Sequence, residues 1–309
     1  MTQLDPTFRS YDCAQAARYA KARLSYPAEL YQVVLDHHQA TGGQFDTVLD
    51  VGCGPGNATR DLALSFDKAI GVDPGEQMIE AAKELGGTTQ TGSPIRFHVA
   101  SAEDLARDTT SIWDIQGGVD LLTAAMAAHW FNMPEFWRAA ERVVKPGGTV
   151  VLWTQASLYC HPSTPNADKV QEALSHLEDV VLKPYVLPSN QLSHDLYDSL
   201  PLPWTVEPVV SAFKESDFVR REWDRDGILT NGQDYAFGSD ETSISRLERG
   251  LGTASMVTRW REAHPELANT DQDCVAVTMR QVREALGNTE ADATFRTGQA
   301  TVILLFKRQ

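Results

Sequence analysis

The sequence predicts an α/β fold with a doubly wound, mostly parallel sheet, and three observations support this. Short β-branched runs alternate with alanine-rich helical runs as far as Trp153. An apolar run that begins at Val48 leads directly into three glycines at alternate positions, 52, 54 and 56, and then into a helical pattern. The final apolar run, 300–306, suits a buried closing strand. We therefore expect one nucleotide-binding type of sheet.

The elements expected before residue 156 follow one another in alternation. A helical start over about 11–40 precedes the sheet. Strands are expected near 47–51, 69–73, 95–99, 119–123 and 149–154, and helices near 57–65, 76–85 and 134–143. The Lys-Pro-Gly-Gly turn at 145–148 ends the last of these helices.

Beyond residue 156 the pattern changes, because prolines are scattered among amphipathic segments. We interpret this part as an insertion and not as a second sheet unit. Helices are expected at Phe218–Trp223, Ser243–Ala263 and Asp271–Leu286. The predicted domains are an N-terminal helical cap (1–45), a core (46–155), a lid (156–298) and a closing core strand (299–309).

Composition excludes several function classes. Of the 309 residues, 27 are Lys or Arg and 42 are Asp or Glu, and the resulting charge of −15 repels phosphate backbones and anionic membranes. No nucleic-acid or membrane partner is expected. The 4 cysteines have no metal-ligand spacing, so no metal is expected. Neither a secretory pattern nor a run of about 18 apolar residues is present, which favours a cytoplasmic location. The oligomeric state stays open.

The glycine loop is the most informative segment. Its glycines remove Cβ atoms where the backbone turns sharply and approaches a ligand, and the helix that follows offers unpaired N–H groups. A dinucleotide loop would place its third glycine at position 57, where this chain has Asn57. An acid, Asp50, stands two residues before the first glycine. This pattern favours a different adenosyl ligand.

The loop and the next predicted strand together resemble the class I S-adenosylmethionine-dependent methyltransferases. That strand, 69–73, ends in Asp73, 23 residues after Asp50. The resemblance implies a Rossmann-like sheet of seven strands with the last one antiparallel, a penultimate strand near 205–213, and S-adenosylmethionine as cofactor with S-adenosylhomocysteine as product. Two further segments, 129–131 (His-Trp-Phe) and 19–27 (Tyr-x-x-x-Arg-x-x-Tyr-Pro), narrow it to the fungal trans-aconitate methyltransferase group and related small-molecule methyltransferases.

The resemblance also implies a set of cofactor residues. Asp73 is expected at the ribose hydroxyls and Met78 on the adenine face, while Asp50 positions the loop. Ser101 departs from the family, which often has Asp there, so it would bind the adenine amino group weakly or leave that role to a neighbouring acid. The full predicted set is Tyr19, Arg23, Asp50, Gly52, Cys53, Gly54, Gly56, Asp73, Met78, Ser101, Ala102, Glu103 and Ala124.

The resemblance favours a carboxylate substrate, which arrives ionised and needs positioning more than deprotonation. His129 and Trp130 are expected to form the acceptor wall, with Arg220, Arg221 and Arg259 as carboxylate partners. A phenol, amine or thiol would instead need a base, and His129 could act as one with an ordinary pKa of about 6.5. If His129 and these arginines lay far from the methyl group, the tricarboxylate hypothesis would weaken.

Three classes of function stay open at this point. The first is a methyltransferase acting on a small molecule, either a trans-aconitate-like carboxylate or an oxygen, nitrogen or sulfur atom of a secondary metabolite. The second is a non-catalytic methyltransferase-like regulatory subunit. The third is a nicotinamide-dependent oxidoreductase on a similar sheet, against which the position of the third glycine counts.

Overall fold

The computed structural model describes residues 25–105, 117–287 and 292–309. Within these ranges a single mixed sheet has the strand order β3-β2-β1-β4-β5-β8-β6, and β7 pairs with β8. The strands are β1 Thr47–Val51, β2 Lys68–Asp73, β3 Arg96–Val99, β4 Val119–Ala125, β5 Val144–Cys160, β6 Val219–Trp223, β7 Asp240–Ser243 and β8 Thr294–Lys307. The first five run parallel to one another, and β8 is antiparallel to its neighbours. The predicted α/β fold with an antiparallel last strand is confirmed.

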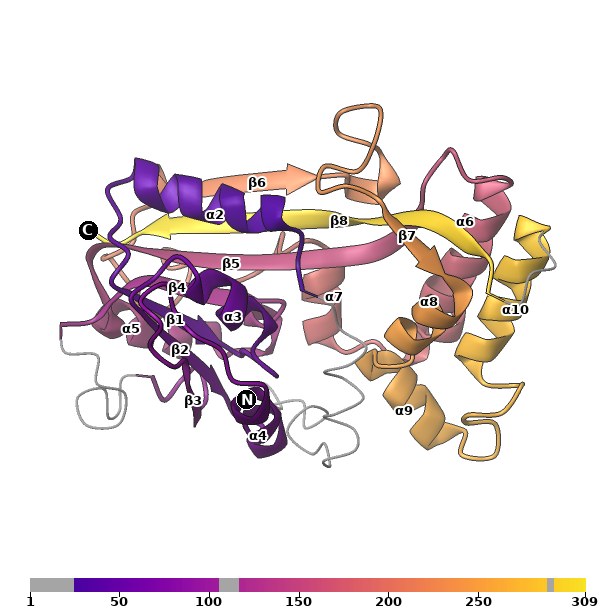
Figure 1. Ribbon diagram of the computed structural model, residues 1–309, viewed down its shortest axis with the longest axis horizontal. Coiled ribbons are helices and arrows are strands. Elements are labelled where there is room, and N and C mark those ends of the chain that lie inside the picture. Colours follow the sequence, from indigo (N-terminus) through magenta and orange to yellow (C-terminus); the bar gives the residue numbers. More distant parts are fainter. Residues whose placement is uncertain (1–24, 106–116, 288–291) are drawn as a thin grey trace.

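Helices cover both faces of the core part of this sheet (Figure 1). The core helices are α2 Ala28–Ala40, α3 Asn57–Ala63, α4 Glu76–Leu85 and α5 Met133–Val143. Leu30 of α2 and Leu62 of α3 pack in the apolar layer on one face, and Phe136 and Trp137 of α5 pack in the layer on the other. The inner strands β1 and β4 are buried on both faces, which is why their sequences are nearly continuous apolar runs.

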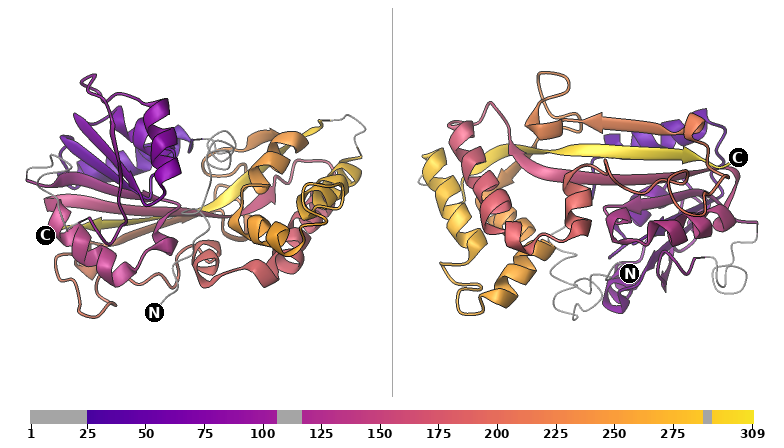
Figure 2. Two further views of the ribbon diagram at one scale, coloured as in Figure 1. Left: turned by 90° about the horizontal axis from the view of Figure 1, so that it is seen from below. Right: turned by 180° about the vertical axis from the view of Figure 1, so that it is seen from behind.

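Two long strands connect the core to the lid. β5 has 17 residues and β8 has 14, and the two pair as far as Cys160 opposite Thr297. In Figure 2 the core helices flank one end of these strands and the lid helices lie at the other end. The lid helices are α6 Ala167–His176, the π-helix η2 Leu177–Val181, α7 Pro188–His194, α8 Ile244–Leu251, α9 Ser255–Ala263 and α10 Cys274–Leu286. The lid has an apolar core of its own that includes Val170, Trp260 and Met279.

Three predictions about the second half are wrong. The segment 218–223 is not a helix, because Val219–Trp223 forms edge strand β6 and pairs with Thr301–Leu305 of β8. The segment 205–213 is not a strand: it forms turns that include a cis peptide bond before Pro208, and proline has no N–H to donate to a ladder. The sheet has eight strands in the described residues, not seven, because lid strand β7 joins β8.

The remaining element predictions agree with the structure in place, with shifted ends. The helical segment 243–263 is divided into α8 and α9 by a short break at 252–254, and the helix expected at 271–286 begins at Cys274. The N-terminal part of the predicted cap, including Tyr19 and Arg23, lies outside the described residues. Strand β5 passes through the predicted core–lid boundary at residue 155 without a break.

Candidate functional site

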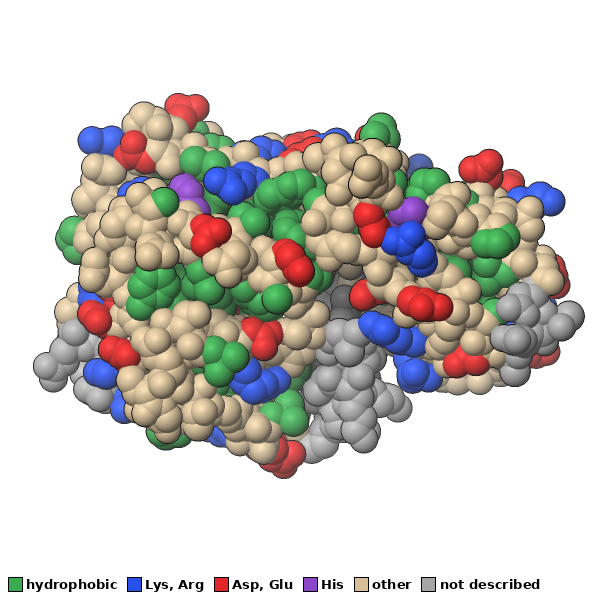
Figure 3. All heavy atoms as spheres, turned by 45° about the horizontal axis from the view of Figure 1, so that its top comes forward, with side chains coloured by type: hydrophobic (Ala, Val, Ile, Leu, Met, Phe, Trp, Pro, Cys, Tyr) green, Lys and Arg blue, Asp and Glu red, His purple; other side chains and the backbone are tan. Residues whose placement is uncertain are grey.

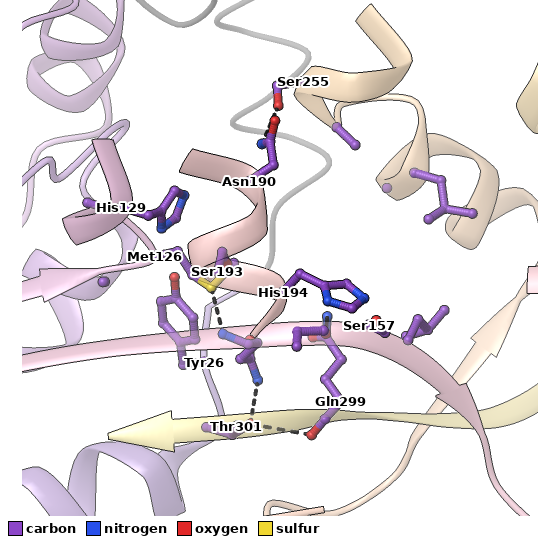
Figure 4. A pocket seen from close by; sticks show the side chains of 18 of the residues that line it. Tyr26, Met126, His129, Ser157, Asn190, Ser193, His194, Ser255, Gln299 and Thr301 are labelled. Carbon is purple, nitrogen blue, oxygen red and sulfur yellow. Dashed lines mark hydrogen bonds between the residues drawn. The ribbon is translucent and has the colours of Figure 1, made fainter. Parts of the chain in front are cut away.

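A cavity of about 950 Å³ lies between the glycine loop and the lid. On the core side it is lined by Gly52, Gly54, Asp73 and Met78, and on the lid side by residues of β5, η2, α7 and α8. Figure 4 shows α7 and β5 bordering it, with His129 on the core side. This volume is at the upper end of ordinary small-molecule sites. The cavity lies outside the carboxyl ends of β1, β2 and β4, where open α/β sheets bind ligands.

The glycine loop has a backbone that other residues adopt only with strain. Gly52, Gly54 and Gly56 have φ of 68°, 53° and 84°, in the left-handed region. A Cβ on Gly52 would lie 2.5 Å from Cβ of Ala127, so the loop packs directly against the segment after β4. A Cβ on Gly54 would meet nothing within 4 Å. The loop therefore needs glycine at position 52 for close packing and at position 54 for its φ.

Asp73 connects the ends of β1 and β2. Its Oδ2 accepts a hydrogen bond from the Gly54 N–H at 2.9 Å, and its Oδ1 accepts one from the Gly75 N–H at 2.8 Å. The carboxylate also lines the cavity. Asp73 therefore fixes the loop and presents oxygen atoms to a ligand at the same time. Its contact with ribose hydroxyls stays a prediction.

Asp50 lies in β1, two residues before the glycine loop, and does not line the cavity. It is fully buried and accepts hydrogen bonds from the hydroxyls of Thr59, at 2.6 Å, and Thr123, at 2.8 Å. Burial raises its pKa to about 6. Asp50 thus ties α3 and β4 to β1, while its expected role in positioning the glycine loop stays a prediction.

The other predicted cofactor residues divide into two groups. Cys53, Met78, Ala102 and Glu103 line the cavity, and Met78 is only 2% exposed. Ser101 and Ala124 are not among the cavity-lining residues. Ser101 donates its hydroxyl hydrogen to Asp104 at 2.8 Å, and the buried Ala124 is followed by Ala125, which does line the cavity.

His129 lies in the 3₁₀ turn η1, Ala128–Trp130, just after β4. Its Nδ1 is 3.0 Å from the hydroxyl of Tyr197, and its ring packs on Trp130 with centroids 4.8 Å apart. Both His129 and Trp130 line the cavity. Burial lowers the pKa of His129 to about 3. The expected pKa of about 6.5 is therefore wrong, because this imidazole is buried without a neighbouring carboxylate.

The three lid arginines predicted at the substrate are not among the cavity-lining residues. Arg220 and Arg221 lie on edge strand β6, where Arg220 donates hydrogen bonds to Asp198 and Glu222 at 2.8 and 2.7 Å. We expected this segment to be a helix of the lid. Because it is an edge strand instead, both arginines lie away from the cavity lining.

Arg259 does not line the cavity itself but contacts a residue that does. It donates to the carbonyl oxygen of Tyr185 at 2.9 Å and to Oδ1 of Asn190 at 2.6 Å. Asn190, which does line the cavity, also donates to the hydroxyl of Ser255 at 3.1 Å (Figure 4). Arg259 therefore positions cavity residues without lining the cavity.

Sequence reasoning missed the charged and histidine side chains that do line the lid side, which are Glu178, Asp179, Lys183, His194, Asp240 and Arg246. Glu178 lies on π-helix η2, and its Oε1 is 3.8 Å from Nε2 of His194 on α7. Burial raises the pKa of Glu178. No linear spacing marks these residues, because they come from separate elements that only the fold brings together.

No helix in the described ranges is both long and apolar enough to cross a bilayer. Within the same ranges, no cluster of three or more His, Cys, Asp or Glu side chains is arranged to hold a metal ion.

Comparison with known proteins identifies the core. Residues 49–152 match the methyltransferase domain family model. A Dictyostelium discoideum protein that is named as a methyltransferase is 29% identical over 63% of this chain and 65% of its own length. A Saccharomyces cerevisiae protein that is named as an S-adenosylmethionine-dependent methyltransferase is 29% identical over 45% of each chain. The chain thus spans between about half and two thirds of the length of these relatives.

The fold as a whole also has a solved counterpart. A structure from Anaeromyxobacter dehalogenans, described as a type II methyltransferase, superposes with a TM-score of 0.62 at 24% identity and covers 93% of this chain and 97% of that one. This match supports the Rossmann-like fold including the lid. The glycine loop, which lacks a Cβ at positions 52, 54 and 56, the carboxylate of Asp73 and the apolar Met78 fit an adenosyl ligand. Residues 49–152 therefore form a methyltransferase domain, with S-adenosylmethionine as its cofactor.

Proposed function

We propose that the whole chain is a methyltransferase for a small molecule bound on the lid side of the cavity, and that the methyl acceptor is a carboxylate of low charge. One observation carries the proposal: a single cavity joins the glycine loop to ionisable lid residues. Its volume of about 950 Å³ accommodates a cofactor and a small acceptor together. The methyltransferase names of the relatives support the same reaction class.

When bound, S-adenosylmethionine supplies a methyl group activated by a sulfonium. The protein then has to hold the acceptor in line with that group and exclude water. Lid and core enclose the cavity from two sides, and β5 and β8 form a continuous floor beneath both. An ionised carboxylate needs no base, which suits a cavity whose core-side histidine, His129, has a pKa of about 3.

The charges around the cavity limit the acceptor. Lys183 and Arg246 are the two Lys or Arg side chains among its described lining residues, whereas Asp73, Glu103, Glu178, Asp179 and Asp240 are acidic. On the face drawn in Figure 3, acidic and basic side chains are also interspersed and do not gather by sign. Two cations can hold one carboxylate, but a tricarboxylate such as trans-aconitate would face more acids than cations. We therefore place monocarboxylates ahead of trans-aconitate.

A second acceptor class is favoured by the contact between Glu178 and His194. A phenol, amine or thiol must lose a proton, and a partly buried carboxyl with a raised pKa beside a histidine is suited to accept it. Under this alternative Glu178 is the base, not His129.

The test begins with calorimetric titration of S-adenosylmethionine and S-adenosylhomocysteine. Methyl-labelled donor is then offered with mono-, di- and tricarboxylates, phenols, amines and thiols, using wild type and Glu178→Gln. Labelled monocarboxylate esters formed equally by both proteins would support the proposal. Transfer to a phenol, amine or thiol that the variant loses would establish the alternative. Cofactor binding without transfer to any class would indicate a regulatory subunit, and absence of binding would overturn both acceptor proposals.

A further inference from the structure

We propose that Tyr197 is a positioning residue that holds His129 in one tautomer, with its Nε2–H directed into the cavity as a fixed hydrogen-bond donor to an oxygen of the acceptor. This inference rests on the proposed function for the identity of the acceptor. The state of the imidazole itself can be tested without any turnover.

The backbone at Tyr197 is strained in a way that serves this contact. Leu196 and Tyr197 have φ of 51° and 63°, in the left-handed region that bulky residues rarely adopt. The Tyr197 N–H donates to the carbonyl oxygen of Leu192 at 2.9 Å, and the side chain is 2% exposed. Strain of this kind persists where the surrounding structure imposes it, often at functional sites. Here it accompanies a phenol held against His129 from the segment after α7.

The direction of the hydrogen bond follows from what surrounds the phenolic oxygen. The distance between that oxygen and Nδ1 of His129 is 3.0 Å. The Thr154 side chain and the backbone N–H groups of Ala128 and His129 also face this oxygen, and an amide N–H can only donate. Burial raises the pKa of Tyr197, so the phenol keeps its proton. In the proposed arrangement the Thr154 hydroxyl donates to the phenolic oxygen, and the phenol donates to Nδ1 of His129.

A neutral imidazole carries one N–H, so a ring that accepts at Nδ1 is protonated at Nε2. His129 lines the cavity, and no hydrogen-bond partner for its Nε2 is found among the described residues. Figure 4 shows the ring pointing from its turn toward α7. Trp130 packs on the ring and restricts its rotation.

This arrangement selects among acceptors. An Nε2–H can donate to a carboxylate, carbonyl or phenolate oxygen but cannot accept a proton from a substrate. It also provides nothing for a protonated amine, which has only donors. His129 thus acts as a donor that orients an oxygen, and substrates bearing an acceptor oxygen at that point are favoured.

The first experiment reads the tautomer directly. Protein with ¹⁵N-labelled histidine is studied by NMR between pH 5 and 8, with and without S-adenosylhomocysteine, and the His129 signals are assigned by their loss in His129→Gln. We expect an Nε2–H imidazole that does not titrate in this range. In Tyr197→Phe we expect mixed tautomers or a titration. An Nδ1–H imidazole in wild type, or an unchanged tautomer in Tyr197→Phe, would overturn the proposal.

The second experiment measures catalysis with a matched control. Tyr185 makes the same kind of contact with Nε2 of His264, at 2.9 Å, away from the cavity lining. We expect Tyr197→Phe to lower kcat for an oxygen acceptor about tenfold, the scale of one oriented hydrogen bond, with the affinity for S-adenosylhomocysteine unchanged. Tyr185→Phe should change kcat less than twofold. An equal fall in both variants would point to a general loss of stability. Failure to find any acceptor would count against the proposed function and leave the tautomer result standing.

Discussion

The cofactor side of the cavity is formed mainly by backbone, whereas the acceptor side is formed mainly by side chains. On the cofactor side, glycines with positive φ turn the loop. Asp73 accepts a hydrogen bond from a loop amide, and Asp50 accepts one from the hydroxyl of Thr59 in the helix that follows the loop. On the acceptor side, side chains from β5, η2, α7 and α8 converge, and residues behind the wall such as Arg259 hold them in place.

This difference teaches where specificity lies. The cofactor site depends on backbone geometry at the ends of buried strands, so one change there should damage binding or folding. The acceptor site depends on side chains carried by helices of the lid, which can be exchanged while the sheet stays intact. His129 joins the two sides, because it follows a core strand and is held by Tyr197 from the lid.

The largest effect is expected for Asp73→Ala. This change removes the acceptors for the Gly54 and Gly75 N–H groups, and hydrogen bonds to a charged group contribute about 1.5–3 kcal/mol each. We expect calorimetry to show a loss of S-adenosylhomocysteine affinity of at least about a hundredfold. Asp67→Ala, an exposed Asp at the other end of the strands, is the matched control and should bind normally. If Asp73→Ala changed the affinity for S-adenosylhomocysteine less than threefold, the cofactor side would not depend on the hydrogen bonds of Asp73.

A pair of glycine variants separates packing from backbone strain. In Gly52→Ala the new Cβ meets Ala127 at 2.5 Å at a residue with positive φ, and we expect a loss of about 2–4 kcal/mol in the free energy of unfolding. In Gly54→Ala the Cβ meets nothing within 4 Å, so the loss should be about 1–2 kcal/mol. Urea denaturation of both variants measures the difference. Equal losses would show that the close approach at position 52 does not control stability.

The core could be predicted from the sequence because its signals are local. The loop, its acids and the alternating strands and helices all lie within about one hundred residues. The spacing of apolar residues in each of these segments follows the period of the strand or helix that the segment forms. The glycines at 52, 54 and 56 have the positive φ that makes glycine necessary there. Met78 and Glu103 were likewise expected near the cofactor, and they line the cavity.

The lid could not be predicted as well because its structure depends on distant partners. The segment 219–223 has no strand signal of its own strong enough to override a helical reading, and its pairing with β8, about 80 residues later, decides the outcome. Placing Arg220 on that strand removes it from the cavity lining. Glu178 and His194 became visible as a pair only when η2 and α7 were brought together.

The pH dependence of stability tests the contact between the two sides. The pKa of His129 is about 3 in the folded protein, against about 6.5 unfolded, so between these values the unfolded state binds the extra proton. This contribution to stability is complete above pH 6.5 and is lost as pH falls, by at most about 1.4 kcal/mol per pH unit. Urea denaturation at pH 7, 6 and 5 should show a shallower pH slope for His129→Gln than for wild type. His176→Gln, at an exposed histidine, is the matched control for the loss of one imidazole. Identical slopes for wild type and His129→Gln would show that His129 is not buried in its neutral form.

The smallest effects distinguish two lid arginines that the sequence treated alike. Arg259 holds Asn190 in the cavity wall, so Arg259→Ala should raise the KM for the acceptor about tenfold and leave the affinity for S-adenosylhomocysteine unchanged. Arg220 is paired with Asp198 and Glu222 on the edge strand, so Arg220→Ala should change KM less than twofold. Steady-state kinetics with the acceptor found in the screen compares them. A larger effect from Arg220 would mean that the acceptor reaches past the cavity to β6, and a weaker cofactor affinity in Arg259→Ala would show that the two sides are not independent.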